Sequence, residues 1–433
     1  MTKPKSRHAT WAWMLWDWAE QPYPTIMQTF IFPVYLAGAV ATAAQNPDQA
    51  IGWATAGAGV ALALIAPVLG RRSDENGRRK FWLVTNTMIL VAIMATSFFV
   101  EPKPEFFLFG LVLYALGSLV QESAFINYYA MLKGVTKESN IGRISGFAWG
   151  LGYVGGIILL MVSLVGFVLP EVPLFGIPTN DSINIRSIFL FSAVWTLLFS
   201  IPLILFVPEI PRKDIGTKES ILSSYSKLWG QLKTLRSQAP ETLKFLISSA
   251  IYRDGLAGVF TFGAVLGTLA FGFDQTSIIF YGVAANIVSG IGAAIGGLLD
   301  DILGSRTVIL ASLVGLVVSG SCVFIFASMG QIAYWMFGLM LCLFVGPAQA
   351  SSRTFVSRFT PAGREGEVFG LYQFTGRAVS FLSGSLWSLS IAIAVALGVS
   401  GNTTIYGIWG LVLILFVGML LLFRVHPRPA VID

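Results

Sequence analysis

A few charged side chains interrupt long apolar segments of this chain, and these residues could do chemistry. Glu20, Arg253, Asp254 and Arg377 each stand about ten residues inside such a segment, which places them ~15 Å deep at a helical rise of ~1.5 Å per residue. A charge at that depth in a bilayer is costly, so it usually faces a partner or water. Two acids and two bases therefore predict a network that binds a charged solute or exchanges a proton.

The network has a dynamic and a static interpretation. Arg253 and Asp254 are neighbours, and neighbouring helical side chains point about 100° apart, so each needs a different partner. We predict that Arg253 or Arg377 exchanges between Glu20, Asp254 and a charged group on a solute. The alternative is a permanent ion pair that only fixes helix packing.

Further polar residues accompany these charges. Asp17 and Glu122 stand nearer the ends of their segments and are expected to act as gate or helix-contact residues. Pro22 and Pro24 must disturb the helical ladder after Glu20, either exposing backbone carbonyls or simply kinking the helix. The side chains that line a cavity, or alternatively bridge helices, are Tyr23, Gln28, Asn127, Tyr372 and Gln373.

The elements that carry these residues are membrane helices. The chain is 55% hydrophobic and 12% charged, with a mean hydropathy of +0.74, far from a soluble domain. Twelve apolar stretches are long enough to cross a lipid bilayer, which predicts an all-α membrane protein. They lie near residues 11–41, 50–69, 81–100, 106–131, 142–169, 186–207, 243–271, 277–299, 307–328, 331–351, 366–397 and 403–424.

A short turn sequence occurs twice and indicates an internal duplication. The two copies are 227 positions apart (297 − 70, 306 − 79). The glycines allow a reversal between two spans, and the acid can accept hydrogen bonds from a neighbouring helix and from its arginine. We expect these turns to clamp helices in one conformation and release them in another. Their residues are Gly70, Asp74, Gly77, Arg78 and Arg79, and Gly297, Asp301, Gly304 and Arg306.

The duplication predicts two six-helix bundles, residues 1–207 and 243–433. A linker at 208–242 separates them and carries apolar residues at helical spacing with lysines and arginines, typical of an amphipathic helix on headgroups; a disordered tether is the alternative. Glycines repeat as well, because Gly142 and Gly146 match Gly366 and Gly370. Such spacing favours close helix packing, and it would also let helices slide.

The distribution of positive charge predicts the orientation. Of the 28 lysines and arginines, 24 fall at the termini, in the linker or in loops on one face. We therefore expect a protein of the cell (inner) membrane with both termini on the cytoplasmic side. Membrane orientation thus explains the net charge of +6 without a nucleic-acid partner. Two cysteines and two histidines, spread along the chain, build no metal site.

Several motifs together resemble a known group of proteins. The twelve spans and the duplicated Gly-x-x-x-Asp-x-x-Gly turn look like the major facilitator superfamily. Further segments are similar to its bacterial "unknown major facilitator" branch, which is related to autophagy-associated vacuolar amino-acid effluxers. These segments are Trp16-Asp17-Trp18-Ala19, Tyr252-Arg253-Asp254-Gly255, Gln349-Ala350-Ser351-Ser352-Arg353, Gly363-Arg364-Glu365, Phe369-Gly370 and Gly376-Arg377.

The resemblance implies alternating access by two six-helix bundles. We therefore expect a secondary carrier for a small polar or charged metabolite, with an amino acid and a coupled proton as candidates, working as a monomer without a cofactor. The chain departs from the branch at Glu20 and Arg253, where relatives usually have small polar residues or asparagine. A channel, a transport-inactive sensor and a lipid-modifying enzyme are the alternatives; no phosphate-loop motif is present.

Overall fold

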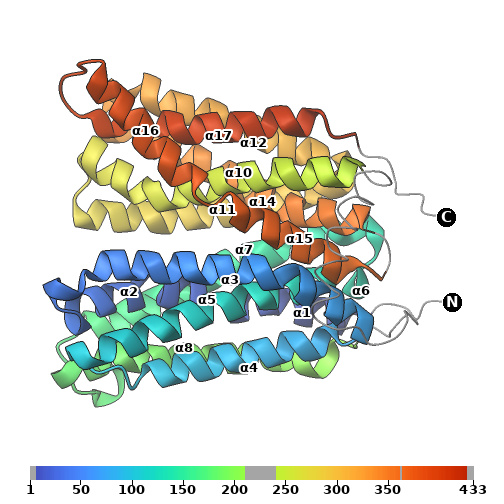
Figure 1. Cartoon of the computed structure of the whole chain (residues 1–433), viewed down its shortest axis with the longest axis horizontal. Helices are drawn as coiled ribbons and strands as arrows, with labels where there is room; N and C mark the ends of the chain where they lie inside the picture. Colours follow the sequence, from blue (N-terminus) through green and yellow to red (C-terminus); the bar gives the residue numbers. More distant parts are fainter. Residues whose placement is uncertain (1–5, 210–239, 361–362, 427–433) are drawn as a thin grey trace. The chain divides into compact units, whose positions relative to one another are not determined.

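The described part of the chain is helical throughout, as the sequence predicts. The computed structural model describes residues 6–209, 240–360 and 363–426, and within these ranges every regular element is a helix (Figure 1). Backbone amides and carbonyls in a bilayer must be satisfied inside the protein, and helices achieve this segment by segment. The predicted linker helix within residues 208–242 falls almost wholly on residues 210–239, which lie outside the described ranges.

The first six predicted spans all correspond to helices. Span one is segmented, and spans two to six are α3, α4, α5, α7 with η6, and α8. The bounds are α1 (Arg7–Ala19), the π-helix η1 (Tyr23–Phe30), α2 (Phe32–Tyr35), the π-helix η2 (Leu36–Val40), α3 (Pro47–Asn76), α4 (Arg79–Ser97), α5 (Phe107–Ala130), α7 (Ile141–Ser163), the π-helix η6 (Leu164–Val168) and α8 (Ile183–Phe206).

The last six predicted spans correspond to helices in the same way. Asp274 precedes the eighth and accepts a hydrogen bond from the Ser277 amide at 2.8 Å. Hydrogen bonding from the Ser277 hydroxyl, and then from this amide, lowers the pKa of the Asp274 carboxyl. The bounds are α10 (Pro240–Val265), the π-helix η9 (Leu266–Ala270), α11 (Gln275–Leu303), α12 (Ser305–Ile325), α13 (Gln331–Ala333), the π-helix η11 (Tyr334–Gly338), α14 (Leu339–Phe359), α15 (Glu365–Ala378), α16 (Leu382–Ala396) and α17 (Gly407–Phe423).

Short helices occupy the connections between spans. Ten helices in the described ranges are long and apolar enough to cross a membrane. Spans one and seven fall outside this group, because span one is broken after Ala19 and α10 carries charges such as Arg253 and Asp254. The connecting helices are η3 (Ala43–Gln45), η4 (Pro104–Phe106), α6 (Leu132–Val135), η5 (Glu138–Asn140), η7 (Leu174–Gly176), η8 (Asn180–Ser182), η10 (Ala327–Met329) and η12 (Thr403–Tyr406).

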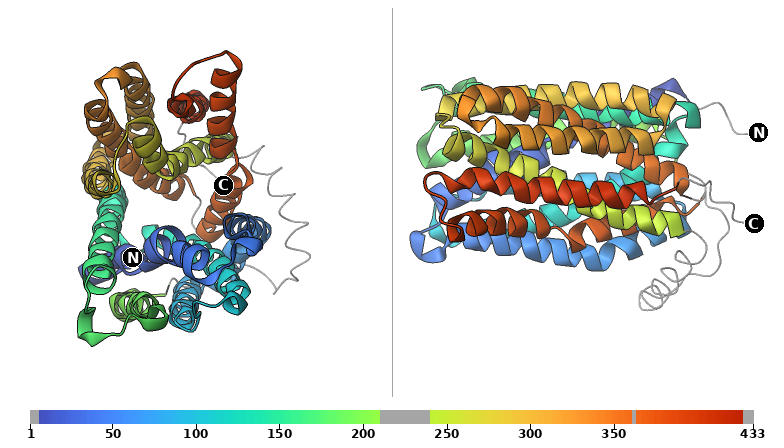
Figure 2. Two further views of the ribbon diagram at one scale, coloured as in Figure 1. Left: turned by 90° about the vertical axis from the view of Figure 1, so that its left-hand side faces the viewer. Right: turned by 90° about the horizontal axis from the view of Figure 1, so that it is seen from above.

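The chain divides into two compact units. The first comprises residues 1–136 and 151–215, and the second comprises residues 137–150 and 216–433. Helix α7 crosses this division, because its first residues, up to Gly150, make their contacts with the second unit. Figure 2 shows the helices of each unit end-on as a bundle.

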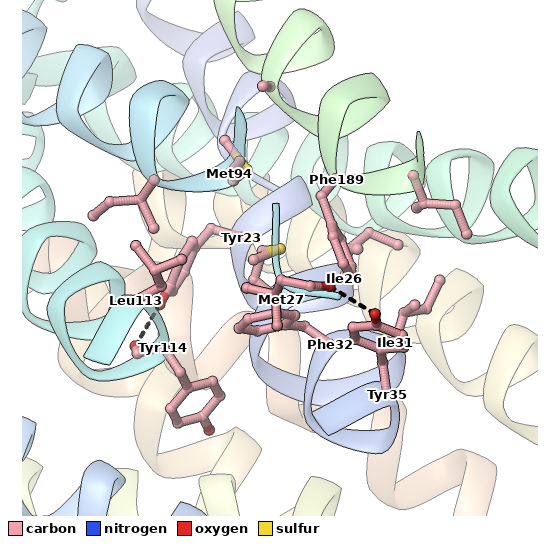
Figure 3. Packing of buried hydrophobic residues seen from close by; sticks show 14 of the residues in the cluster. Tyr23, Ile26, Met27, Ile31, Phe32, Tyr35, Met94, Leu113, Tyr114 and Phe189 are labelled. Carbon is pink, nitrogen blue, oxygen red and sulfur yellow. Dashed lines mark hydrogen bonds between the residues drawn. The ribbon is translucent and has the colours of Figure 1, made fainter. Parts of the chain in front are cut away.

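An aromatic and aliphatic cluster forms the core of the first unit. Tyr23 and Phe32 from span one are almost completely buried in it, and Phe32 meets the ring of Phe189 from α8 edge-on at 5.0 Å (Figure 3). Helices α3 and α4 both pack along α5, and α8 packs along α1 and α4. Burial of these large rings fixes the helices around span one.

Close backbone contact between α11 and α14 organises the second unit. A Cβ on Gly292 would come within 2.1 Å of the Leu343 carbonyl, and one on Gly346 within 2.2 Å of the Ser289 carbonyl. Lipid gives helices no hydrophobic reason to associate, so this packing depends on small residues and dispersion contacts. The same holds where α7 begins, because a Cβ on Gly146 would come within 2.3 Å of the Ala293 carbonyl.

Candidate functional site

The first polar centre lies where span one breaks. Helix α1 ends at Ala19, and the π-helix η1 begins at Tyr23, so the predicted disturbance by Pro22 and Pro24 is confirmed. Pro22 has no N–H to give to the carbonyl of Trp18, and the indole N–H of Trp195 donates to that carbonyl instead, at 3.2 Å. The freed carbonyl therefore serves helix bridging.

Glu20 lies at this break and is 4% exposed. Its carboxylate accepts hydrogen bonds from two side-chain amides, that of Gln21 at 3.0 Å and that of Gln121 on α5. Amide donors can stabilise a buried carboxylate without neutralising it. Glu20 thus sits in a polar environment supplied by glutamines, of which Gln121 was not singled out from the sequence.

Asp17 on α1 and Glu122 on α5 accompany Glu20, which directly follows α1. Asp17 precedes it by three residues on α1 and is buried, and Glu122 follows Gln121 on α5 and is half-buried. Three carboxylates of the first unit therefore lie on, or directly after, helices α1 and α5. Their predicted role as gate or helix-contact residues stays a prediction.

The other predicted cavity residues of the first unit bridge helices. The Tyr23 hydroxyl donates to the carbonyl of Tyr114 at 2.8 Å within the core cluster shown in Figure 3. Gln28 donates to the Ser118 hydroxyl at 2.9 Å. Asn127 accepts from the Ser73 hydroxyl at 2.6 Å. Of the two interpretations of these polar groups, the structure thus favours helix bridging.

The second polar centre lies where span eleven breaks. Helix α15 ends at Ala378 and α16 begins at Leu382, and Figure 1 shows them as separate segments. Ser380 stands in the break, where its amide and hydroxyl both donate to the carbonyl of Arg377, at 3.3 and 3.0 Å. Broken membrane helices supply polar backbone groups to binding sites.

Arg253 and Asp254 of α10 form hydrogen bonds to the two helices on either side of this break, Arg253 to α15 and Asp254 to α16. The Arg253 guanidinium donates to the carbonyl of Tyr372 at 3.1 Å and to the side-chain oxygen of Gln373 at 2.9 Å, both on α15. It also lies 3.7 Å from the centre of the Tyr372 ring. Asp254 accepts from the amide and the hydroxyl of Ser383 on α16, at 2.6 and 3.2 Å.

These contacts give the partners of two members of the predicted charge network in this structure. Arg253 and Asp254 do have separate partners, as their positions on the helix predict. However, within the described ranges Asp254 forms no ion pair with Arg253 or with Arg377. Asp254 instead caps the start of α16, because the unpaired amides at the start of a helix attract an anion. Exchange of partners with Glu20 stays a prediction.

The first repeated turn ties together three helices. Asp74 at the end of α3 pairs with Arg79 at the start of α4, at 2.6 Å, and both side chains are buried. Arg79 also donates to the carbonyl of Ala130 on α5 at 3.3 Å. The predicted acid–arginine contact is therefore confirmed in this copy. Arg78 is exposed and lies 6.0 Å from the Phe81 ring.

The second repeated turn uses a different arginine. Arg306 donates to the carbonyl of Phe423 at 2.9 Å, so the expected pairing of Arg306 with Asp301 is wrong. Arg358 at the end of α14 takes that place, reaching Asp300 at 2.5 Å and Asp301 at 3.1 Å. Arg358 and Asp300 were not singled out, because a motif shows which residues repeat but not which helix end lies opposite.

Asp301 also caps the start of α7. Its two carboxylate oxygens accept from the amides of Gly142 and Arg143, at 2.8 and 2.9 Å. The expected acceptance of hydrogen bonds from a neighbouring helix is thus confirmed. A carboxylate there satisfies orphan amides and complements the positive end of the helix dipole.

Only one glycine of each repeated turn makes the reversal. Gly77 and Gly304 have positive φ values of 59° and 83°, where a side chain would be strained. Gly70 and Gly297 lie inside α3 and α11, so the prediction that they form the turn is wrong. Gly297 instead permits close packing, since a Cβ there would come within 2.6 Å of the Gly142 carbonyl.

Solved structures share this fold. The proton:xylose symporter XylE, bound to 6-bromo-6-deoxy-D-glucose, matches with a TM-score of 0.71 and 12% identity, covering 97% of this chain and 94% of that one. A bacterial homologue of the iron transporter ferroportin in an outward-facing state gives 0.69 and 12%, covering 96% and 98%. The described part of this chain thus has the fold that these membrane transporters share.

The family follows from the sequence comparisons. The family model described as "Vacuole effluxer Atg22 like" matches residues 133–430, and the chain belongs to this family. An uncharacterized MFS-type transporter YxiO of Bacillus subtilis (strain 168) is 24% identical over 416 residues, 95% of this chain and 93% of that protein. Autophagy-related protein 22-1 of Aspergillus fumigatus (strain ATCC MYA-4609 / CBS 101355 / FGSC A1100 / Af293) is 25% identical over 57% of this chain and 43% of its own length.

Proposed function

We propose that this protein is a secondary carrier that moves a small polar or charged metabolite across the cell (inner) membrane by alternating access. An amino acid is the candidate substrate and a proton the candidate coupling ion. The observation that carries the proposal is the placement of Glu20, Arg253 and Asp254 at or beside the breaks in spans one and eleven. Charges held at interrupted membrane helices are suited to solute binding.

The repeated turns supply a reversible clamp. Asp301 binds the first amides of α7. The later residues of α7 belong to the first unit, so a conformational change in one unit can reach the other through this helix. Loss of these two hydrogen bonds would free the start of α7. Clamps that form in one state and open in another are what a two-state carrier needs.

Orientation and coupling belong to the same proposal. The positive charges at both termini and in the central segment support a cytoplasmic location for these regions. Glu20 is the candidate proton carrier, because each neighbouring glutamine side chain has N–H groups that bond the ionised carboxylate and an oxygen that could accept from the protonated acid. No nucleotide is hydrolysed in this scheme, and the monomer is the transporting form.

The experiment is counterflow of a labelled metabolite panel, including the twenty amino acids, into liposomes that contain the purified full chain. Saturable counterflow of a solute supports a carrier. Conductance without saturation would mean a channel, and a product formed from lipid would mean an enzyme; either result overturns the proposal. No counterflow for any solute in the panel also counts against it.

A matched pair of variants tests the role of Glu20. Glu20→Gln should insert normally but lower the transport rate about tenfold or more, since hydrogen bonds to a charged group are worth ~1.5–3 kcal/mol. Glu171→Gln, at an exposed loop glutamate, should transport like the parent chain. If Glu20→Gln transports normally, Glu20 has no part in the transport step. A rate indifferent to pH and to a proton gradient would exclude proton coupling.

A further inference from the structure

Arg253 carries a membrane-embedded positive charge whose partners are all neutral. It lies near the middle of the 26-residue helix α10, and its guanidinium contacts a backbone carbonyl, an amide oxygen and the Tyr372 ring. Among the described residues, no carboxylate lies within ion-pair distance of it. Arg79 and Arg358 differ in this respect, because both pair with aspartates.

The guanidinium also keeps unused donors. Arginine has five N–H groups in a planar fork, and the hydrogen bonds to Tyr372 and Gln373 use two of them. A carboxylate would accept two parallel hydrogen bonds from such a fork and supply the missing negative charge. The geometry is therefore that of an incomplete ion pair.

The residues near this charge are small, and the acid next to it in the sequence is bonded elsewhere. Asp254, the nearest acid in sequence, is committed to Ser383 at 2.6 Å and does not neutralise Arg253. Gly376 lies beside the guanidinium, where a Cβ would come within 3.3 Å of Nη1. Three small residues follow Arg253 on the same face of α10, namely Ala257, Thr261 and Ala264. All three are exposed, and Arg253 is half-buried.

We propose that Arg253 is the substrate anchor of the carrier and binds a singly charged carboxylate group of the transported solute. This inference rests on the proposed transport function and names its substrate class. The charge that remains uncompensated at this site is a single one, which matches one carboxylate. A phosphate group would bring up to two negative charges to the same single guanidinium.

The test measures binding rather than transport, with the purified full chain in detergent. The probes are the twenty L-amino acids, L-lactate and succinate, each compared with its carboxamide, and inorganic phosphate. At least one carboxylate should bind about tenfold or more tightly than its amide, and Arg253→Gln should bring that ratio close to one. Arg253→Lys should keep part of the preference, and Arg424→Gln, at an exposed helix end, should leave it unchanged.

A second variant separates binding from a purely structural role. Gln373→Glu would place a carboxylate at the position of the side-chain oxygen that now lies 2.9 Å from Nη2. It should raise the melting temperature by completing an internal ion pair, and it should abolish the carboxylate preference. A structural role for Arg253 predicts the stabilisation without the loss of binding.

Several outcomes would overturn the inference. These are an unchanged carboxylate-to-amide ratio in Arg253→Gln, binding of phosphate alone, and transport confined to solutes that carry no carboxylate group. The last of these would leave the carrier function intact, whereas Arg253-dependent carboxylate binding without any transport would contradict the carrier function instead.

Discussion

The carboxylate of Asp254 on α10 receives both the backbone amide and the hydroxyl of Ser383 on α16, at 2.6 and 3.2 Å. Ser383 is the second residue of α16, so a side chain from another helix satisfies one of the amides that a new helix start leaves without a partner. The break in span eleven is thereby stabilised at bilayer depth, where water cannot take over these bonds.

Removal of this contact should destabilise the second unit. We expect Asp254→Ala to cost about 1–3 kcal/mol, because it leaves the buried Ser383 amide unsatisfied, and Asp254→Asn to cost less, because its oxygen can still accept. Ser383→Ala removes only the hydroxyl bond and should cost the least. The measurement is thermal unfolding of the purified chain in detergent. Equal melting temperatures for Asp254→Ala and the parent chain would show that the contact is dispensable.

The equivalent arginines of the two repeated turns should respond differently to mutation. Arg79→Gln breaks a buried ion pair with Asp74 and should cost about 3–5 kcal/mol, because it strands a buried carboxylate. Arg306→Gln removes one bond to the carbonyl of Phe423 and should cost within about 1 kcal/mol.

The measurement is urea or thermal unfolding of Arg79→Gln, Arg306→Gln and Arg358→Gln, which compares the loss of stability at the two turns. Arg358→Gln should resemble Arg79→Gln, since Arg358 takes the position opposite Asp300 and Asp301. A large loss from Arg306→Gln and none from Arg358→Gln would contradict the observed pairing.

Two glycines of the first unit should tolerate an added methyl group very differently. A Cβ on Gly117 would lie 2.2 Å from the Tyr23 hydroxyl oxygen, so Gly117→Ala should cost about 1–3 kcal/mol through overpacking. Gly57, also within a helix, has nothing within 4 Å of its Cβ position, and Gly57→Ala should be neutral or slightly stabilising. The measurement is the melting temperature of each variant in the same detergent. Similar values for both would show that the Tyr23 side chain can move to accommodate the methyl group.

Much of the fold could be predicted because it is local in sequence. Each of the twelve predicted spans corresponds to helix, since an apolar stretch of sufficient length in lipid must satisfy its own backbone groups. The break after Ala19 was predictable for the same reason, because prolines remove specific donors. The Asp74–Arg79 pair was predictable because five residues separate its partners across one turn.

The partners of the polar side chains depended on tertiary structure. The repeat motif implied that Asp301 would meet Arg306, but the end of α14 supplies Arg358 instead, from 57 residues away. Likewise, the depth of Asp254 in its span was readable from sequence, whereas its role at the start of α16 depended on how α10 lies against the break in span eleven. The sequence by itself determined where charges enter the membrane helices, because hydropathy and helical rise are local properties. Only the tertiary structure decided which charge has an oppositely charged partner and which, like Arg253, has neutral partners, because those partners come from residues far away in the sequence.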